Sequence, residues 1–277
     1  MIWPWKRARI RATAYLPEHL PDYVLAVMGG EADLMNDHLC YSRGGTLVLV
    51  GYPLGGRFDS AALASVVERA LRYYRPSLLS LIAPVIPPLD LAEAGRGSDR
   101  YYRLELDRLR IGQKTRNMIK GAMRSLSVSE DRVLGDEHRA LIDSFLDRAR
   151  ADDSVRRIYG GMPRYVERSK SSLVLSARDG RGRLIAFDVA DFGSGEYAFY
   201  MFNIRSREGG VPGASDLLLH ELVLRAKDAG RRYVNLGLGI NDGIVFFKEK
   251  WGGAPFVGYE HRLYDVGGRI IERLLAR

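Results

Sequence analysis

A glycine-rich loop at residues 205–216 holds the residues with the clearest chemical potential in this sequence. It follows a stretch at 197–204 whose aromatic and β-favouring residues predict a half-buried strand. It leads into a predicted helix, for which Ser215 or Asp216 is a suitable N-cap. The free N–H groups and partial positive charge of a helix start favour phosphate oxygens, and Arg205 and Arg207 add full charges. A simple solvated connection explains the same residues equally well, so both interpretations stay open.

Lys248 is a second candidate for chemistry. The helix after the loop stops at Gly230, a strand is predicted at 233–238, and a short helix follows with the sequence VFFKEKW at 245–251. A lysine there can stabilise a leaving group or bridge to a phosphate. Alternatively, it is a helix lysine whose stem covers apolar surface. As a partly exposed residue, it should be replaceable without loss of the fold.

Direct transfer of an acyl group also needs a base for the attacking group. Glu221, Asp188 and Glu196 are the candidates, although a glutamate at a helical position such as 221 is more often a surface or ion-paired residue. Other chemistry has little support. No G-x-S-x-G elbow is present, and the glycines at 237, 239 and 243 lack the spacing of a dinucleotide loop. No metal is expected, because the histidines are scattered at 19, 38, 138, 220 and 261.

The stretch 196–253 resembles the second half of a GNAT-superfamily acyltransferase domain. Its FKEKWG segment at 247–252 is similar to the FK-x-x-FG ending of the Fem-type peptidoglycan aminoacyltransferases. Many GNAT enzymes carry a general-acid tyrosine at about the position of Lys248. Arg207 and Gly210 fit the usual GNAT phosphate signature, Q/R-x-x-G-x-G/A, but Pro212 replaces its last small residue. The donor is therefore open between acyl-CoA and aminoacyl-tRNA.

This resemblance implies roles for further residues. In the GNAT fold, the strand before the phosphate loop holds the donor carbonyl through backbone N–H groups, here within 200–204. Lys248 and Glu221 are the predicted catalytic residues. The predicted donor-binding residues are Phe202, Asn203, Ile204, Arg205, Arg207, Gly210, Gly213, Ala214, Ser215 and Asp216.

A basic helical segment at 112–125 carries a second resemblance. KTRNMI at 114–119 followed by Ala122 is similar to the K-x-R-x-x-I-x-x-A helix that opens the second domain of Fem-type enzymes. Its Arg-Asn pair is also similar to a region in the C-terminal domain of phosphatidylglycerol lysyltransferases. These families consist of two GNAT-like halves, and the resemblance spans roughly residues 45–264. It implies that Arg116, Asn117 and Lys120 contact the acceptor or tRNA. Without the resemblance, these residues indicate only an ordinary cationic helix face.

The composition is that of a folded protein. Its 277 residues are 46% hydrophobic and 27% charged, and the net charge of +8 favours polyanions or simply a solvated basic surface. The single cysteine, Cys40, suits a reducing cytoplasm. No apolar run reaches the ~20 residues that span a bilayer. The basic N-terminus lacks the apolar core of a secretory signal, and Trp3 and Trp5 there favour a first strand over contact with a membrane interface.

Element order completes the predicted fold. Apolar strands at 45–52 and 77–84 flank a helix at 60–74, and a hairpin at 172–190 precedes the strand at 197–204. Residues 90–100 look like a linker, 151–168 look irregular, and a terminal helix is predicted at 269–275. We expect an α/β (α+β) fold of tandem GNAT-like domains at 1–97 and 98–277, each with a mixed, mostly antiparallel sheet of its own and flanking helices.

The resulting hypothesis is an acyltransferase that acts by direct transfer from acyl-CoA, such as acetyl-CoA, or from aminoacyl-tRNA. The acceptor would be an amine or hydroxyl of a small molecule, a lipid or a cell-wall precursor. The alternative is a non-catalytic GNAT-like protein that binds an acidic ligand or partner. A cytoplasmic location is expected, with peripheral membrane association and oligomeric state left open.

Overall fold

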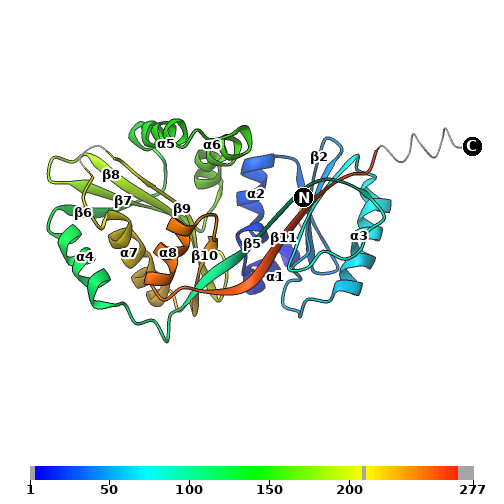
Figure 1. The fold of residues 1–277 in the computed structure, drawn as a ribbon, viewed down its shortest axis with the longest axis horizontal. Coiled ribbons are helices and arrows are strands. Elements are labelled where there is room, and N and C mark those ends of the chain that lie inside the picture. Colours follow the sequence, from blue (N-terminus) through cyan, green and yellow to red (C-terminus); the bar gives the residue numbers. More distant parts are fainter. Residues whose placement is uncertain (1–3, 208–209, 268–277) are drawn as a thin grey trace, which may run out of the picture.

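A single mixed sheet runs through the molecule in the computed structural model, which describes residues 4–207 and 210–267 (Figure 1). Within these residues the sheet has eleven strands, in the order β1-β2-β3-β4-β11-β5-β10-β9-β8-β7-β6. Neighbouring strands are antiparallel except for β3 with β4 and β9 with β10. The strands are β1 (Glu31–Met35), β2 (His38–Arg43), β3 (Thr46–Val50), β4 (Leu78–Ala83), β5 (Ala92–Glu105), β6 (Leu126–Asp131), β7 (Ser172–Asp179), β8 (Leu184–Asp191), β9 (Tyr197–Arg205), β10 (Tyr233–Leu238) and β11 (Ala254–Asp265).

Helices cover both faces of this sheet. We call the face under α4, α7 and α8 the α7 face, and the opposite face, under α1, η1, α2, α5 and α6, the α2 face. In the N-terminal half, α3 packs on the side opposite α2. The helices are α1 (Pro4–Thr13), the 3-10 helix η1 (Pro17–His19), α2 (Pro21–Met28), α3 (Ser60–Tyr74), α4 (Gln113–Met123), α5 (Asp136–Arg148), α6 (Asp153–Arg168), α7 (Ala214–Asp228) and α8 (Asp242–Lys250).

Several elements form where local sequence signals predict them. Asp59 caps α3 by accepting a hydrogen bond of 2.8 Å from the Ala62 N–H, and the helix ends at Arg75 in the left-handed region. The apolar strands β3 and β4 and the hairpin of β7 and β8 are likewise confirmed. Local signals are therefore enough wherever an element carries its own cap or its own apolar pattern.

The predicted linker at 90–100 is instead part of β5. This strand pairs with β11 from Arg103 opposite Ala254 to Ala92 opposite Asp265. The expectation of two separate sheets is therefore wrong, because β5 and β11 continue one sheet from the N-terminal half into the C-terminal half. Residue 97, the predicted boundary, falls inside β5, and the boundary itself stays a prediction.

The N-terminal stretch also differs from expectation. Residues 4–13 form α1 rather than a strand, and the Trp5 side chain is exposed. The stretch at 151–168 is not irregular, because Asp152 caps α6 by accepting hydrogen bonds from the N–H groups of Ser154 and Val155. Trp3 and the helix predicted at 269–275 lie outside the described residues.

Contact between α2 and α6 gives a stability prediction. A Cβ atom added at Gly161 of α6 would lie 2.9 Å from Val27 Cα, whereas one at exposed Gly160 would meet nothing within 4 Å. We expect Gly161→Ala to lower the free energy of unfolding by about 1–3 kcal/mol through overpacking. Gly160→Ala should raise it by about 0.5–1 kcal/mol through helix propensity. Urea denaturation of the two variants measures both, and equal effects would contradict the close approach of α6 to α2.

Candidate functional site

The strands β9 and β10 part shortly after they begin. They pair in parallel at only three positions, the last being Asn235 with Phe199. Beyond Asn235, β10 bulges against β5 and passes through Gly237 at a φ of 75°. We call the region where residues 200–205 of β9 and residues 237–238 of β10 are no longer paired with each other the β9–β10 opening. Because successive residues of a strand present N–H groups to opposite edges, alternate N–H groups of β9 face this opening.

The start of α7 lies after β9, next to α4. Gly213 precedes the helix at a φ of 84°, and no side chain caps it, so the predicted capping by Ser215 or Asp216 is wrong. A Cβ atom at Gly213 would lie 2.7 Å from the carbonyl oxygen of Met118 in α4. Only glycine therefore fits this crossing without strain. An α7 without a side-chain cap keeps its partial positive charge available to a ligand.

Asp216 has a structural partner set instead. It is 4% exposed and accepts hydrogen bonds from Trp251 Nε1 at 2.8 Å and from Lys250 Nζ at 2.9 Å. These contacts join the first turn of α7 to the end of α8. A buried carboxylate held by a lysine and an indole N–H is already satisfied. Asp216 thus fixes the two helices that flank the opening, and donor binding is not needed to explain it.

A chain of side chains runs from α7 into the sheet. Ser215 Oγ donates to Asn203 Oδ1 at 2.9 Å, and Asn203 Nδ2 donates to Asp188 Oδ1 at 2.5 Å. Asp188 is fully buried, and its Oδ2 has no hydrogen-bond partner among the described residues. Burial raises the pKa of Asp188 well above its usual range, and the bond from Asn203 opposes this only in part. The shift favours the protonated form of Asp188, which is the form that cannot accept a proton.

Lys248 is buried rather than partly exposed. It is 3% exposed, its Nζ donates to the carbonyl of Leu238 at the end of β10, and it lies 5.6 Å from the centre of the Tyr102 ring. Burial lowers its pKa to about 8, and the carboxylate of Asp99 opposes the shift. Its amine thus lies at the end of the β9–β10 opening, on the α7 face.

Asp99 supports this position and is a residue that sequence reasoning missed. Its carboxylate accepts hydrogen bonds from the N–H groups of Gly239, at 3.1 Å, and Ile240, at 2.8 Å. These bonds hold the turn between β10 and α8. Phe247 stacks on Tyr200 with ring centres 6.4 Å apart, whereas Phe246 is 67% exposed. Asp99 carried no signal because it lies in the stretch that looked like a linker.

The structure does not bring Glu221 to Lys248. Glu221 Oε2 accepts from Arg225 at 2.6 Å, and Arg225 also pairs with Glu130 on the edge strand β6. Glu196, the other candidate base, pairs with Arg232 at the surface. Neither glutamate lies at the β9–β10 opening.

The remaining predicted residues divide by position. Phe202 and Ile204 pack on the α2 face, while Arg205, Arg207 and Gly210 are exposed near the start of α7. Ala214 is buried in the first turn of that helix. On α4, Arg116, Asn117 and Lys120 are exposed, and Gln113 bonds to both Arg116 and Asn117.

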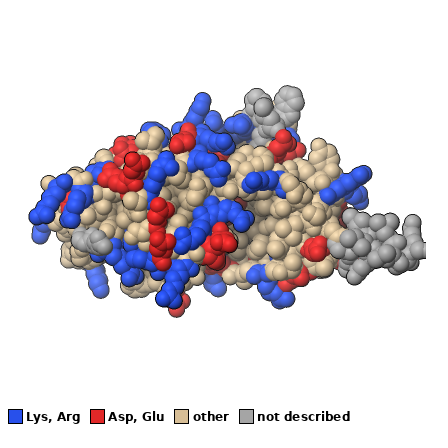
Figure 2. Space-filling view, turned by 90° about the horizontal axis from the view of Figure 1, so that it is seen from above, with Lys and Arg blue, Asp and Glu red and all other residues tan. Residues whose placement is uncertain are grey.

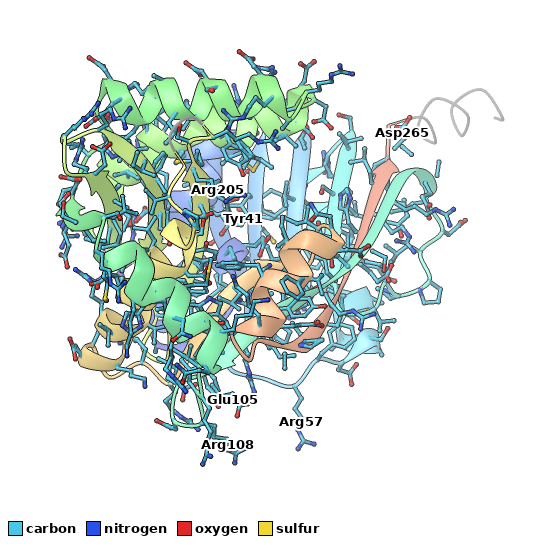
Figure 3. All side chains as sticks on the ribbon, turned by 60° about the vertical axis from the view of Figure 1, so that its left-hand side comes forward. Tyr41, Arg57, Glu105, Arg108, Arg205 and Asp265 are labelled. Carbon is cyan, nitrogen blue, oxygen red and sulfur yellow. The ribbon has the colours of Figure 1, made fainter. Side chains whose placement is uncertain are left out.

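A hollow in the protein surface lies away from this site. It has a volume of about 600 Å³ and is lined by Arg103, Glu105, Arg108 and Phe256 among others. Figure 3 places Glu105 and Arg108 at the lower edge of the molecule, apart from Arg205. In Figure 2, basic and acidic side chains alternate over the face that is shown, so the net positive charge is not gathered there into one patch.

The described residues were also searched for a metal site and for a helix that could cross a membrane. No three His, Cys, Asp or Glu residues within 4–207 and 210–267 are arranged to hold a metal ion. None of the helices in the same ranges has the length and apolar character needed to cross a membrane.

Comparison with solved structures identifies the fold. No protein-family model matches the chain, and no curated protein sequence matches it. It superposes on FemX with a TM-score of 0.58, 9% identity and 96% of each chain covered. The C-terminal domain of a candidate lysylphosphatidylglycerol synthetase from Agrobacterium fabrum superposes with a TM-score of 0.57 and 16% identity, and the match covers 93% of this chain and 90% of that one. A tandem GNAT protein of clavulanic acid biosynthesis superposes with a TM-score of 0.51 and 15% identity. The match covers 82% of this chain and 78% of that one. The chain thus has a GNAT-like fold of two halves.

Asp188 gives a testable prediction on stability. An acid whose pKa is raised in the folded state destabilises that state as pH rises from its unfolded pKa, about 3.9, toward its folded pKa. We expect Asp188→Asn to keep the fold and to gain about 1.4 kcal/mol over the wild type for each pH unit in that window. Denaturation between pH 4 and 9 measures this, with Asp143→Asn at an exposed site of α5 as the control. Parallel pH curves for wild type and Asp188→Asn would show that the carboxyl is charged.

Proposed function

We propose that this chain is an acyltransferase that moves an acyl or aminoacyl group directly from an activated carrier to an amine or hydroxyl. The main support is the parting of β9 and β10 beside the start of α7. This arrangement supplies unpaired strand N–H groups for a carbonyl oxygen and a helix start for a phosphate. Both lie in one place, as a phosphate-bearing acyl donor requires.

Each part of the arrangement has a chemical task. N–H groups of β9 hold the donor carbonyl and stabilise the oxyanion as the acceptor attacks, which contributes roughly 3 kcal/mol for each donor. The start of α7, with Arg205 and Arg207 nearby, holds the donor phosphate. Lys248, in its charged form, stabilises the leaving group at the end of the opening. Ser215 and Asn203 fix the first turn of α7 against β8 and β9.

Two donor classes fit, acyl-CoA and aminoacyl-tRNA. The exposed basic residues of α4, among them Lys114, Arg116 and Lys120, adjoin the start of α7 through the contact of Gly213 with Met118. A row of cations beside the phosphate site favours a polyanionic donor. The likeness to FemX and to the candidate lysylphosphatidylglycerol synthetase is compatible with this donor and with a lipid or cell-wall precursor as acceptor. Buried, free Cys40 fits a cytoplasmic location.

Donor binding is the first test. Coenzyme A, acetyl-CoA and aminoacyl-tRNA are titrated calorimetrically into the wild type and into Arg205→Glu/Arg207→Glu. We expect one donor class to bind and the charge reversal to weaken it at least tenfold, because a charged hydrogen bond contributes about 1.5–3 kcal/mol. Arg72→Glu on α3 is the control, and it should bind the donor with the affinity of the wild type. Lys114→Glu/Lys120→Glu should weaken aminoacyl-tRNA but not coenzyme A. If neither class binds, the chain is not an acyltransferase of this kind.

Lys248 gives a second test, on turnover. Because the side chain is buried, Lys248→Met is preferable to alanine, which would leave a cavity. We expect turnover to fall ~10²-fold with donor affinity unchanged, as on removal of one preorganised charge. In the wild type, turnover should fall as pH rises through about 8, where Lys248 loses its charge. Exposed Lys227→Met on α7 is the control. Wild-type turnover in Lys248→Met would reduce Lys248 to a structural role.

A further inference from the structure

The hollow beside Arg103 is not used by the proposed function, and we call it the Arg103 hollow. Its volume of about 600 Å³ is within the range of small-molecule sites, roughly 300–1,000 Å³. It is bordered by the end of β5, by the connection from β5 to α4 and by residues 252–256, which lead from α8 into β11. A hollow of this size can hold an organic molecule rather than an inorganic ion alone.

The Arg103 hollow lies at the other end of β10 from the β9–β10 opening. Glu105, which lines the hollow, pairs with Tyr233 at the start of β10, whereas the opening adjoins Leu238 at the end of that strand. Between these two ends β10 spans about 17 Å. Figure 3 likewise shows Glu105 at the lower edge of the molecule, apart from Arg205. The hollow is therefore distinct from the proposed donor site.

Both strands next to β5 bulge beside Arg103. Arg103 pairs with Asn235 of β10 and with Ala254 of β11, and the register of each strand shifts within the next few residues. In β11 the residue left unpaired with β5 is Phe256, and its ring centre lies 5.1 Å from the guanidinium carbon of Arg103. Bulges redirect side chains and are frequent beside functional sites. The bulge in β11 thus brings an aromatic ring to the hollow.

Arg103 is held in one orientation. Its guanidinium lies 4.3 Å from the centre of the Tyr233 ring, and it donates to Tyr197 Oη at 3.0 Å and to Glu105 Oε1 at 2.9 Å. Its side chain is still 25% exposed. A guanidinium has five N–H donors, so these two bonds leave others for a ligand. Because the planar group is already oriented, it loses little freedom when it binds an anion.

The charge of the lining suits a dianion. Arg108 and Arg110 are exposed on the connection to α4, and the side chain of Arg108 is 86% exposed. With Arg103 they make three cations against one anion, Glu105, which leaves a net charge of +2. A phosphate monoester carries about −1.5 to −2 charges at pH 7, whereas a carboxylate carries a single charge. A phosphate monoester therefore matches this lining better than a carboxylate does.

Apolar groups complete the lining. Leu109, Pro255 and half-buried Phe256 adjoin the arginines. Inorganic phosphate would leave this apolar surface in water, whereas a planar ring attached to the phosphate would cover it and could stack on Phe256. Small-molecule sites commonly combine such an apolar lining with a few polar groups that orient the ligand.

We infer that the Arg103 hollow is a second ligand site, separate from the donor site, and that it binds a small phosphate monoester with a planar ring. The three arginines hold the phosphate, and Phe256, Leu109 and Pro255 receive the ring. Nucleoside monophosphates and aryl phosphates share this chemistry. Binding uses neither the β9–β10 opening nor Lys248, so it does not depend on the proposed acyl transfer.

Titration with simple phosphates tests this site. Adenosine monophosphate and phenyl phosphate are titrated calorimetrically, and saturation-transfer NMR detects contact with their rings. The proteins are the wild type, Arg108→Glu/Arg110→Glu and, as a control with the same change of charge, Arg205→Glu/Arg207→Glu at the proposed donor site. We expect at least one of the two phosphates to bind the wild type through its ring and phosphate, and not after loss of the phosphate, as in adenosine or phenol.

The variants should differ in affinity. Arg108→Glu/Arg110→Glu should weaken binding about tenfold or more, because charge-assisted hydrogen bonds to the phosphate are lost. The control at the donor site should keep the wild-type affinity. Phe256→Leu keeps an apolar side chain but loses the ring, and it should weaken binding about two- to tenfold.

The outcomes decide both the site and the ligand. Binding of adenosine monophosphate alone assigns the hollow to nucleotides, and binding of phenyl phosphate alone assigns it to aryl phosphates. No binding of either phosphate to the wild type, or equal weakening in the two charge-reversed variants, would overturn the site. Loss of binding only in Arg205→Glu/Arg207→Glu would locate the phosphate at the start of α7 and would also overturn it. Inorganic phosphate that binds as tightly as the esters would overturn the role of the ring.

Discussion

The antiparallel pairing of β5 with β11 is the interaction on which the rest of the molecule depends. The two strands are paired from Ala92 to Arg103, and β11 reaches β4 on its other edge. This pairing gives two GNAT-like halves one continuous sheet (Figure 1). It also places consecutive residues Tyr101 and Tyr102 on opposite faces at the junction, because side chains alternate along a strand. Lys248 lies on the face of Tyr102, 5.6 Å from the centre of its ring.

The same junction explains where β9 and β10 part. On its β5 side β10 bulges between Asn235 and Gly237, so its last residues turn away from β9 while they stay paired with β5. Asp99, on β5, then fixes the turn after β10 through two backbone N–H groups. The opening is thus held from the β5–β11 side, whereas α7 and the Asp216 contacts hold it from the β9 side.

The sequence predicts the elements that carry local signals and misses those set by distant partners. Asp59 and the apolar pattern after it suffice for α3. The first residues of β5 are polar, largely exposed and contain Gly95 and Gly97, so only pairing with β11, far along the chain, makes them a strand. Around the site, the glycine-rich loop predicts the start of α7, and the FKEKWG segment predicts that Lys248 lies on a short helix after β10. The burial of Asp188 cannot be predicted from the sequence, because it depends on Asn203 and on α7 above it.

Burial shifts the pKa values of the two ionisable groups beside the opening, Lys248 and Asp188, in opposite directions. It lowers the pKa of Lys248 and raises that of Asp188, because a low-dielectric interior disfavours the charged form of each. Lys248 contacts the end of β10, whereas Asp188 of β8 is bonded to Asn203 of β9, so the two groups lie on opposite sides of the opening. Lys248, with a pKa of about 8, is thus a group through which pH near neutrality would act on the leaving group of the proposed transfer.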